Sequence, residues 1–231
     1  MSICFILAVK IDTPKHAFYV HRCIASIRRI YTEPIILVLA PGTAAIQTDH
    51  PGIQQVENPY FGTLGCVYLF DRHRYADYAY ILHDNMVVLS KLPFPSSNVT
   101  FIYDFHEPGM ETRHYQKNYE KLLPPSMCRD LIETQTQGCF GPAMGIYHHA
   151  VSKTGVLALV PLVTTKDDTC AMERVFAYIC RKNQVGHDVL CGSIFGDANP
   201  WIHKEFETMT LDELVSLNRK EYIIKSLAGR T

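Results

Sequence analysis

The sequence predicts an α/β domain in which a mixed, mostly parallel central sheet is flanked by helices, as in Rossmann-like proteins. Residues 3–9 (ICFILAV) and 35–40 (IILVLA) are continuous apolar runs, typical of strands in a parallel sheet that is covered on both faces. The segment between them predicts a helix that stops before Pro34, because apolar residues recur there at helical spacing: Val20, Ile24, Ile27 and Ile30. A strand, a helix and a second parallel strand form one right-handed unit.

The rest of the chain continues this alternation. A helix is expected after Gly62 and Gly65, followed by strands over 78–82 and 99–105. Residues 106–137 predict a loop with one or two short helices, and residues 138–151 predict a glycine-rich strand and turn. Residues 170–184 predict a helix, and residues 211–230 predict a surface helix followed by a tail. Strands separated by helices favour the α/β class.

Length and composition favour one folded domain over residues 1–231. The chain is 47% hydrophobic and 19% charged, which is ordinary for a folded soluble protein. Its net charge of -1 provides no general attraction to nucleic acid or anionic lipid, so a bound phosphate must be held locally. No apolar run approaches the roughly 20 residues of a membrane span. Most of the eight cysteines lie in apolar runs, and we expect reduced core thiols in a cytoplasmic protein.

A polar triplet, His83-Asp84-Asn85, interrupts the apolar run YAYILHDNMVVL over residues 78–89. Burying three polar side chains without partners would be costly, so we expect them to have partners or a ligand. The triplet stands at the carboxyl end of a predicted strand, where α/β sheets bind ligands. The alternative is a simple turn, since Asp and Asn favour turns.

In their order along roughly residues 3–180, these features resemble the GT-A-fold glycosyltransferases, most of all the large inverting family that uses nucleotide-diphospho-sugars. Cys23-Ile24-Ala25-Ser26-Ile27 is similar to a step in that family's first helix, and His83-Asp84-Asn85 occupies the place of its Asp-x-Asp motif. Residues 138–142 resemble its glycine-rich acceptor segment, and residues 167–174 resemble its Glu-Asp-x-Asp-x-x-x-Arg pattern.

The resemblance implies a nucleotide-sugar half over about residues 1–105 and an acceptor half over about 106–231. It implies donor contacts from Val9, Lys10, Asp12, Pro41, Gly62 and Asp84. It implies acceptor contacts from Gly138, Phe140, Gly141 and Trp201. His83, Asp84 and Asn85 would hold Mn²⁺ or Mg²⁺, although two of the usual charges of the motif are missing; the alternative is a metal-free site in which basic residues neutralise the diphosphate.

Glycosyl transfer explains why such groups are needed. Charge develops on the leaving diphosphate and must be stabilised by a metal, cationic side chains or helix N-termini. A carboxylate must take the proton of the attacking acceptor hydroxyl. The resemblance gives that role to Asp168, with Glu173 as the rival base. The predicted function is transfer of a sugar from a nucleotide-diphospho-sugar to the hydroxyl of a glycan or glycoconjugate, with inversion and assistance by a divalent metal.

Other interpretations stay open at this point. Asp167 and Asp168 could be only the N-terminal cap of a helix. Gly138 and Gly141 could serve only close backbone packing, and Trp201 could cap the core. His148 and His149 favour structural roles, because adjacent strand residues point to opposite faces. For the whole chain, the alternatives are a catalytically silent relative that binds nucleotide or glycan in a larger assembly, and a sugar-phosphate nucleotidyltransferase.

Overall fold

The fold is built around one seven-stranded sheet in the order β10-β6-β9-β4-β1-β2-β3. It is seen in a computed structural model, which describes residues 1–60, 63–105, 112–134, 138–139, 144–185, 188–190, 208–217 and 223–225. The strands are β1 (Ile3–Val9), β2 (Ile35–Leu39), β3 (Ile53–Glu57), β4 (Tyr78–His83), β6 (Val99–Phe101), β9 (Gly145–His148) and β10 (Asp188–Val189).

The sheet is mixed and mostly parallel. Strands β3, β2, β1 and β4 are parallel neighbours, and β9 runs antiparallel between β4 and β6. Strand β10 is parallel to β6 at the far edge. The predicted Rossmann-like α/β class is therefore confirmed.

Two further pairs of short strands lie outside this sheet. Strand β5 (Met86–Val88) pairs antiparallel with β11 (Ile223–Lys225), and β7 (Asp104–Phe105) pairs with β8 (Gly138–Cys139). The single strand predicted over 99–105 is therefore wrong, because its two ends, β6 and β7, join different sheets. The prediction of a tail after the last helix missed β11. It also missed β3, whose sequence IQQVE is polar because the strand lies at an edge and is largely exposed.

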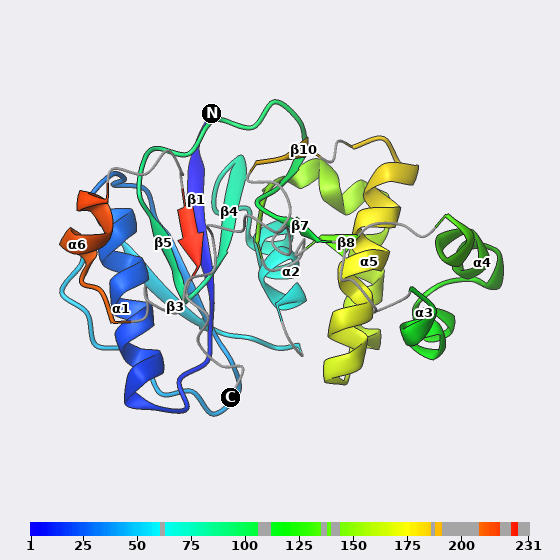
Figure 1. Ribbon diagram of the computed structural model, residues 1–231, viewed down its shortest axis with the longest axis horizontal. Coiled ribbons are helices and arrows are strands. Elements are labelled where there is room, and N and C mark those ends of the chain that lie inside the picture. Colours follow the sequence, from blue (N-terminus) through cyan, green and yellow to red (C-terminus); the bar gives the residue numbers. More distant parts are fainter. Residues whose placement is uncertain are drawn as a thin grey trace.

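Helices cover both faces of the sheet (Figure 1). Helices α1 and α6 lie on one side, α2 and α5 lie on the other, and α3 and α4 lie outside α5. Their bounds are α1 (Pro14–Arg28), α2 (Leu64–His73), α3 (Gln116–Leu122), α4 (Pro125–Glu133), α5 (Lys166–Lys182) and α6 (Leu211–Ser216). Three 3₁₀ helices complete the set: η1 (Thr112–Tyr115), η2 (His149–Thr154) and η3 (Val156–Leu162).

The two large hydrophobic clusters lie one on each face of the sheet, and a third, small one joins Val87, Leu214 and Ile224. Phe5 and Leu7 of β1 pack in the cluster that includes Ile24 of α1. Ile6, the residue between them, packs in the cluster that includes Phe176 of α5. Because successive strand residues point to opposite faces, covering both faces requires the continuous apolar runs seen in the sequence.

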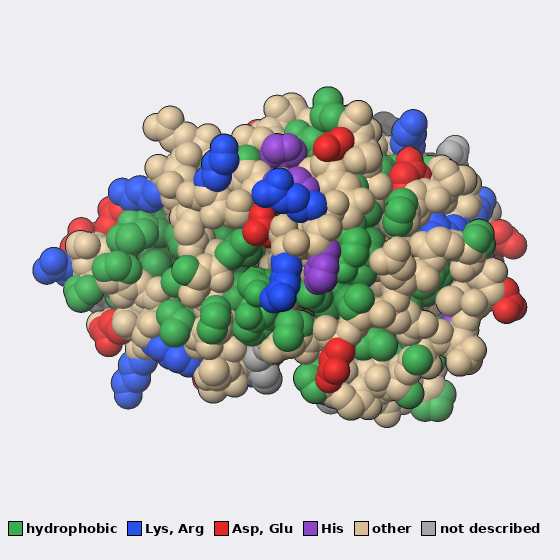
Figure 2. Space-filling model, turned by 180° about the vertical axis from the view of Figure 1, so that it is seen from behind, with side chains coloured by type: hydrophobic (Ala, Val, Ile, Leu, Met, Phe, Trp, Pro, Cys, Tyr) green, Lys and Arg blue, Asp and Glu red, His purple; other side chains and the backbone are tan. Residues whose placement is uncertain are grey.

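The surface seen from behind carries charges of both signs. Lys, Arg and His side chains form a small group near the middle of this face, and Asp and Glu side chains lie beside and around it (Figure 2). This mixture fits the net charge of -1. Within the described ranges, every helix is too short or too polar to cross a membrane.

Candidate functional site

The topology points to one place on the sheet. Strand β1 has β2 on one side and β4 on the other, so the strand order reverses between β1 and β4. Open α/β sheets bind ligands outside the carboxyl ends of their strands at this reversal. The residues that leave β1 and β4 there are Val9-Lys10 and His83-Asp84.

Lys10 and Asp84 join the ends of these two strands. The backbone N–H of Lys10 donates a hydrogen bond to Asp84 Oδ2 at 3.3 Å. The Lys10 ammonium lies 2.9 Å from Asp12 Oδ2, and these two side chains are 67% and 52% exposed. An exposed pair of this kind contributes little stability, so its charges can rearrange around a ligand. The site thus presents a carboxylate and an exposed ammonium at the predicted position.

The polar triplet forms the connection between β4 and β5. His83 ends β4, Asp84 and Asn85 form the turn, and Met86 begins β5. His83 and Asp84 are half-buried, whereas Asn85 is only 7% exposed. Burial raises the pKa of the Cys23 thiol in α1, and the nearby charge of Asp84 raises it further.

A ready-made metal site was not found near this turn. Within the described ranges, no group of three His, Cys, Asp or Glu side chains is placed to hold a metal ion. Asp84 is the one carboxylate of the predicted set His83, Asp84 and Asn85.

The other predicted donor contacts differ in their surroundings. The Val9 side chain is buried in the core, and its carbonyl accepts the N–H of Ala40 at 2.8 Å. Asp12 is exposed, and its N–H donates to His16 Nδ1 at 3.3 Å. Pro41 is exposed in the turn after β2. Gly62 lies outside the described residues.

Asn58 is a buried polar residue at the same edge that the sequence reasoning missed. It follows β3, is 6% exposed, and its N–H donates to Leu39 O at 2.8 Å. A Cβ atom on Gly65, in the first turn of α2, would collide with the Asn58 side chain. Gly65 therefore allows Asn58 and α2 to pack closely at the carboxyl edge. The Asn-Pro step after IQQVE could have marked this position in the sequence. It was overlooked because the polar sequence IQQVE did not predict a strand before it.

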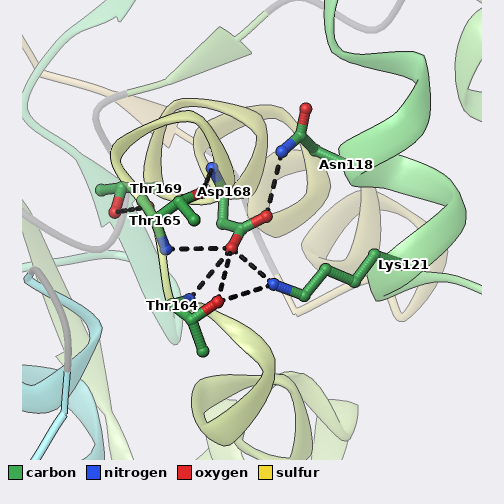
Figure 3. A network of polar contacts seen from close by, with 6 residues as sticks. All are labelled: Asn118, Lys121, Thr164, Thr165, Asp168 and Thr169. Atoms are coloured by element: carbon green, nitrogen blue, oxygen red, sulfur yellow. Dashed lines mark hydrogen bonds and ion pairs between the residues drawn. The ribbon is translucent and has the colours of Figure 1, made fainter.

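Asp168 is at the centre of a polar network in the first turn of α5 (Figure 3). The Thr165 side chain accepts the Asp168 N–H at 3.1 Å, and the Thr165 N–H donates to Asp168 Oδ2 at 3.0 Å, which is a capping box. Asn118 and Lys121 of α3 donate to the same carboxylate at 3.0 and 2.6 Å. Thr164 adds its N–H at 3.0 Å and its hydroxyl at 3.3 Å.

These contacts set the charge state of Asp168. Burial by itself raises the pKa of this carboxyl, but the hydrogen bonds, led by the one from Lys121, outweigh burial and hold its pKa well below the usual range. The side chain is 2% exposed. A carboxylate with these donors is a weak proton acceptor, so the contacts favour a structural role. The predicted role as base stays a prediction, and the rival base Glu173 is half-buried one turn further along α5.

Asp84 and Asp168 lie at the same end of the sheet. The end of α5 contributes Asn183 to a pocket that Asn98 also lines. Asn98 O accepts the His148 N–H, and His148 is opposite Tyr78 at the amino start of β4. Helix α5 therefore ends at the amino edge of the sheet and begins near the carboxyl edge, as Figure 1 shows.

The predicted acceptor contacts are described only in part. Gly138 belongs to β8, which pairs with β7 and contacts α5. Phe140, Gly141 and Trp201 lie outside the described residues. His148 and His149 have structural contacts, as predicted: His148 Nδ1 accepts the Ala150 N–H at 3.1 Å, and the His149 ring stacks on Phe70 with 4.3 Å between ring centroids.

Comparisons with known proteins give structural likeness only. No family model and no curated protein matches the sequence. A structure of the galactosyltransferase LgtC, in complex with donor and acceptor sugar analogs, is 10% identical, with a TM-score of 0.41 over 93% of this chain and 94% of that chain. An active-site mutant of LgtC is 8% identical, with a TM-score of 0.44 over 98% of this chain and 88% of that chain. Likeness this distant does not show what activity this chain has.

Proposed function

We propose that this chain is a glycosyltransferase that moves a sugar from a nucleotide-diphospho-sugar to a hydroxyl of a glycan or glycoconjugate. The observation that carries the proposal is the contact between the Lys10 N–H and Asp84 at the reversal between β1 and β4. This contact lies at the edge where sheets of this kind bind ligands, which supports a donor-binding role for His83-Asp84-Asn85. The order of motifs along the chain supports the same assignment.

The donor would lie across the carboxyl ends of β1 and β4. The Lys10 ammonium is exposed there and can neutralise part of the charge on a diphosphate. The first turn of α2 contains no acidic residue, so no negative charge there would oppose a phosphate near the positive end of its dipole. Both groups would stabilise the charge that develops on the leaving group as the bond to the sugar breaks.

Assistance by Mn²⁺ or Mg²⁺ is a finer part of the proposal. Asp84 would supply one oxygen ligand, and the diphosphate would supply others, as is common for magnesium bound with nucleotides. The described residues do not form a three-ligand site without the donor. Comparison of activity in Mn²⁺ with activity in EDTA tests the requirement for a metal directly.

Inversion requires a base on the acceptor side. We propose Asp168 for this role, with Glu173 as the alternative, because both lie in the first turns of α5 at the carboxyl end of the sheet. To act, the Asp168 carboxylate would have to exchange at least one of its donors for an acceptor hydroxyl. The Asp168 carboxylate already accepts several hydrogen bonds within the protein, and this also favours a second candidate function: a catalytically silent protein that binds the nucleotide sugar.

The test is incubation with a panel of nucleotide sugars in Mn²⁺ or EDTA, followed by measurement of nucleoside diphosphate release. Release that disappears in Asp84→Ala supports the transferase. Binding without release under every condition supports the silent protein, and pyrophosphate formed from a nucleoside triphosphate and a sugar phosphate supports a nucleotidyltransferase. Asp168→Asn should stop transfer while leaving nucleotide binding intact if Asp168 is the base.

A further inference from the structure

Helix α1 directs two buried polar side chains at the turn that carries Asp84. Cys23 and Ser26 are three residues apart, so they lie on the same face of the helix, and both are 0% exposed. They belong to the step Cys23-Ile24-Ala25-Ser26-Ile27. Apart from one bond from Ser26 to Cys23 O within the helix, their partners come from the segment that runs through and beyond the turn.

The Cys23 sulfur bridges the two ends of the turn. Its S–H donates to the His83 carbonyl at 3.8 Å, and the backbone N–H of Met86 donates to the same sulfur. His83 and Met86 are the first and last residues of the turn, and Asp84 and Asn85 lie between them. In many β-turns the first carbonyl and the last N–H bond to each other. Here the thiol gives each of them a partner from α1.

Ser26 holds the chain just after the turn. Its hydroxyl donates to Cys23 O at 2.7 Å and accepts the N–H of Val88 in β5 at 3.0 Å. Strand β5 pairs with β11, so β11 and α1 together fix its position. Three contacts with α1 therefore fix the turn and the strand that follows it.

We propose that Cys23 and Ser26 are positioning residues for donor binding, which hold the β4–β5 turn so that Asp84 stays beside the Lys10 N–H. The inference rests on the proposed function, because that function gives Asp84 a donor to meet. Removal of either side chain takes away hydrogen bonds that hold the backbone of the turn or of β5 to α1. The turn then samples other arrangements, and the fraction of protein that is ready to bind falls.

The first test measures the affinity for UDP, GDP, CDP and ADP by calorimetry. Cys23→Ala and Ser26→Ala should each lower the affinity for the nucleotide that binds best by about tenfold. Cys23→Ser keeps a donor and an acceptor and should restore most of the affinity. Cys180→Ala and Ser152→Ala are the matched controls and should bind as wild type. Cys180 is also 0% exposed, and Ser152 makes a similar 2.8 Å bond to His149 O at the amino edge of the sheet.

The second test needs no variant and measures the rate of thiol alkylation, resolved by peptide mass spectrometry. A fully buried thiol reacts only when its surroundings open. A nucleotide that binds the closed turn suppresses that opening, so it should slow the alkylation of Cys23 by the same factor by which it stabilises the turn. The alkylation rate of Cys180, in α5, should not change.

The outcomes separate this inference from the proposed function. If wild type binds a nucleotide, but both alanine variants bind it equally well and alkylation of Cys23 is unchanged, the positioning role is refuted and the donor site stands. If none of the four nucleotides binds wild type, both conclusions are overturned. Weaker binding in the two alanine variants, rescued in Cys23→Ser and absent from the controls, supports the positioning role.

Discussion

The ammonium of Lys121 lies 2.6 Å from Oδ2 of Asp168 and ties helix α3 to the first turn of α5. The same ammonium donates to the Thr164 hydroxyl at 2.9 Å. Asp168 is almost fully buried, whereas the Lys121 side chain is 40% exposed. This ion pair orders the outer helices beside the carboxyl edge of the sheet, where we place substrate binding.

Replacing Lys121 by methionine should destabilise the protein. The buried Asp168 carboxylate would lose its only cationic donor among the described residues while keeping its amide and hydroxyl donors. Because Lys121 is partly exposed and screened by solvent, we expect a loss of about 1 to 2 kcal/mol in the free energy of unfolding. Urea denaturation of Lys121→Met against wild type measures this difference.

The matched control is Lys182→Met. Lys182 also lies 2.6 Å from a carboxylate, Asp130 Oδ2, but its side chain is 55% exposed and that of Asp130 is 35% exposed. A pair this open to solvent should contribute below about 1 kcal/mol. Equal losses in the two variants would show that the burial of Asp168 does not strengthen its bond to Lys121.

Asp168 should also control stability in acid. Its pKa in the folded protein lies below the ordinary value of 3.8, so the unfolded chain binds more protons in that range. The stabilisation is therefore complete above pH 3.8 and is lost as the pH falls from there toward the lower folded pKa. In Asp168→Asn this part of the change in the free energy of unfolding with pH should disappear. Urea denaturation at a series of acidic pH values measures it. An unchanged slope would mean that Asp168 is not held in its charged form.

The sequence predicted those parts of the fold that depend on local apolar pattern. The runs over 3–9 and 35–40 became β1 and β2, because strands covered on both faces must be continuously apolar. Strand β3 was missed because its exposed edge position permits IQQVE. Strand β11 was missed because its partner β5 is more than 130 residues away, and local pattern contains no information about such a pairing.

The candidate site was predictable only in part for a similar reason. The triplet at 83–85 was visible because it interrupts an apolar run, and the rule for parallel sheets placed it at the carboxyl edge. The hydrogen bonds that Asn118 and Lys121 donate to Asp168 come from another helix about 50 positions earlier in the chain. The sequence around Asp168 therefore could not show whether its carboxylate has such partners. The sequence pattern around Asp168 fits both a helix cap and a catalytic base, and its hydrogen-bond partners in the structure favour the cap.

Gly65→Ala should destabilise the carboxyl edge of the sheet. The new Cβ would overlap the Asn58 side chain, so Asn58 or α2 must move, and we expect a loss of about 1 to 3 kcal/mol. The double variant Asn58→Ala with Gly65→Ala removes the overlap. In a double-mutant cycle by urea denaturation, the alanine at 65 should cost much less when residue 58 is alanine. If the losses in the free energy of unfolding of the two single variants add up in the double variant, the overlap with Asn58 is not the cause of the destabilisation.

Lys10→Met should weaken nucleoside diphosphate binding without unfolding the protein. The substitution removes the exposed ammonium but keeps the backbone N–H that holds Asp84, so the turn should be unaffected. We expect about fivefold weaker binding at low salt and a smaller difference as salt screens the charge. Calorimetry at two salt concentrations measures both effects, and Lys91→Met, at another exposed lysine, is the control. Equal losses of affinity in both variants would indicate a general effect of net charge. An unchanged affinity in Lys10→Met would show that the diphosphate does not bind at the end of β1.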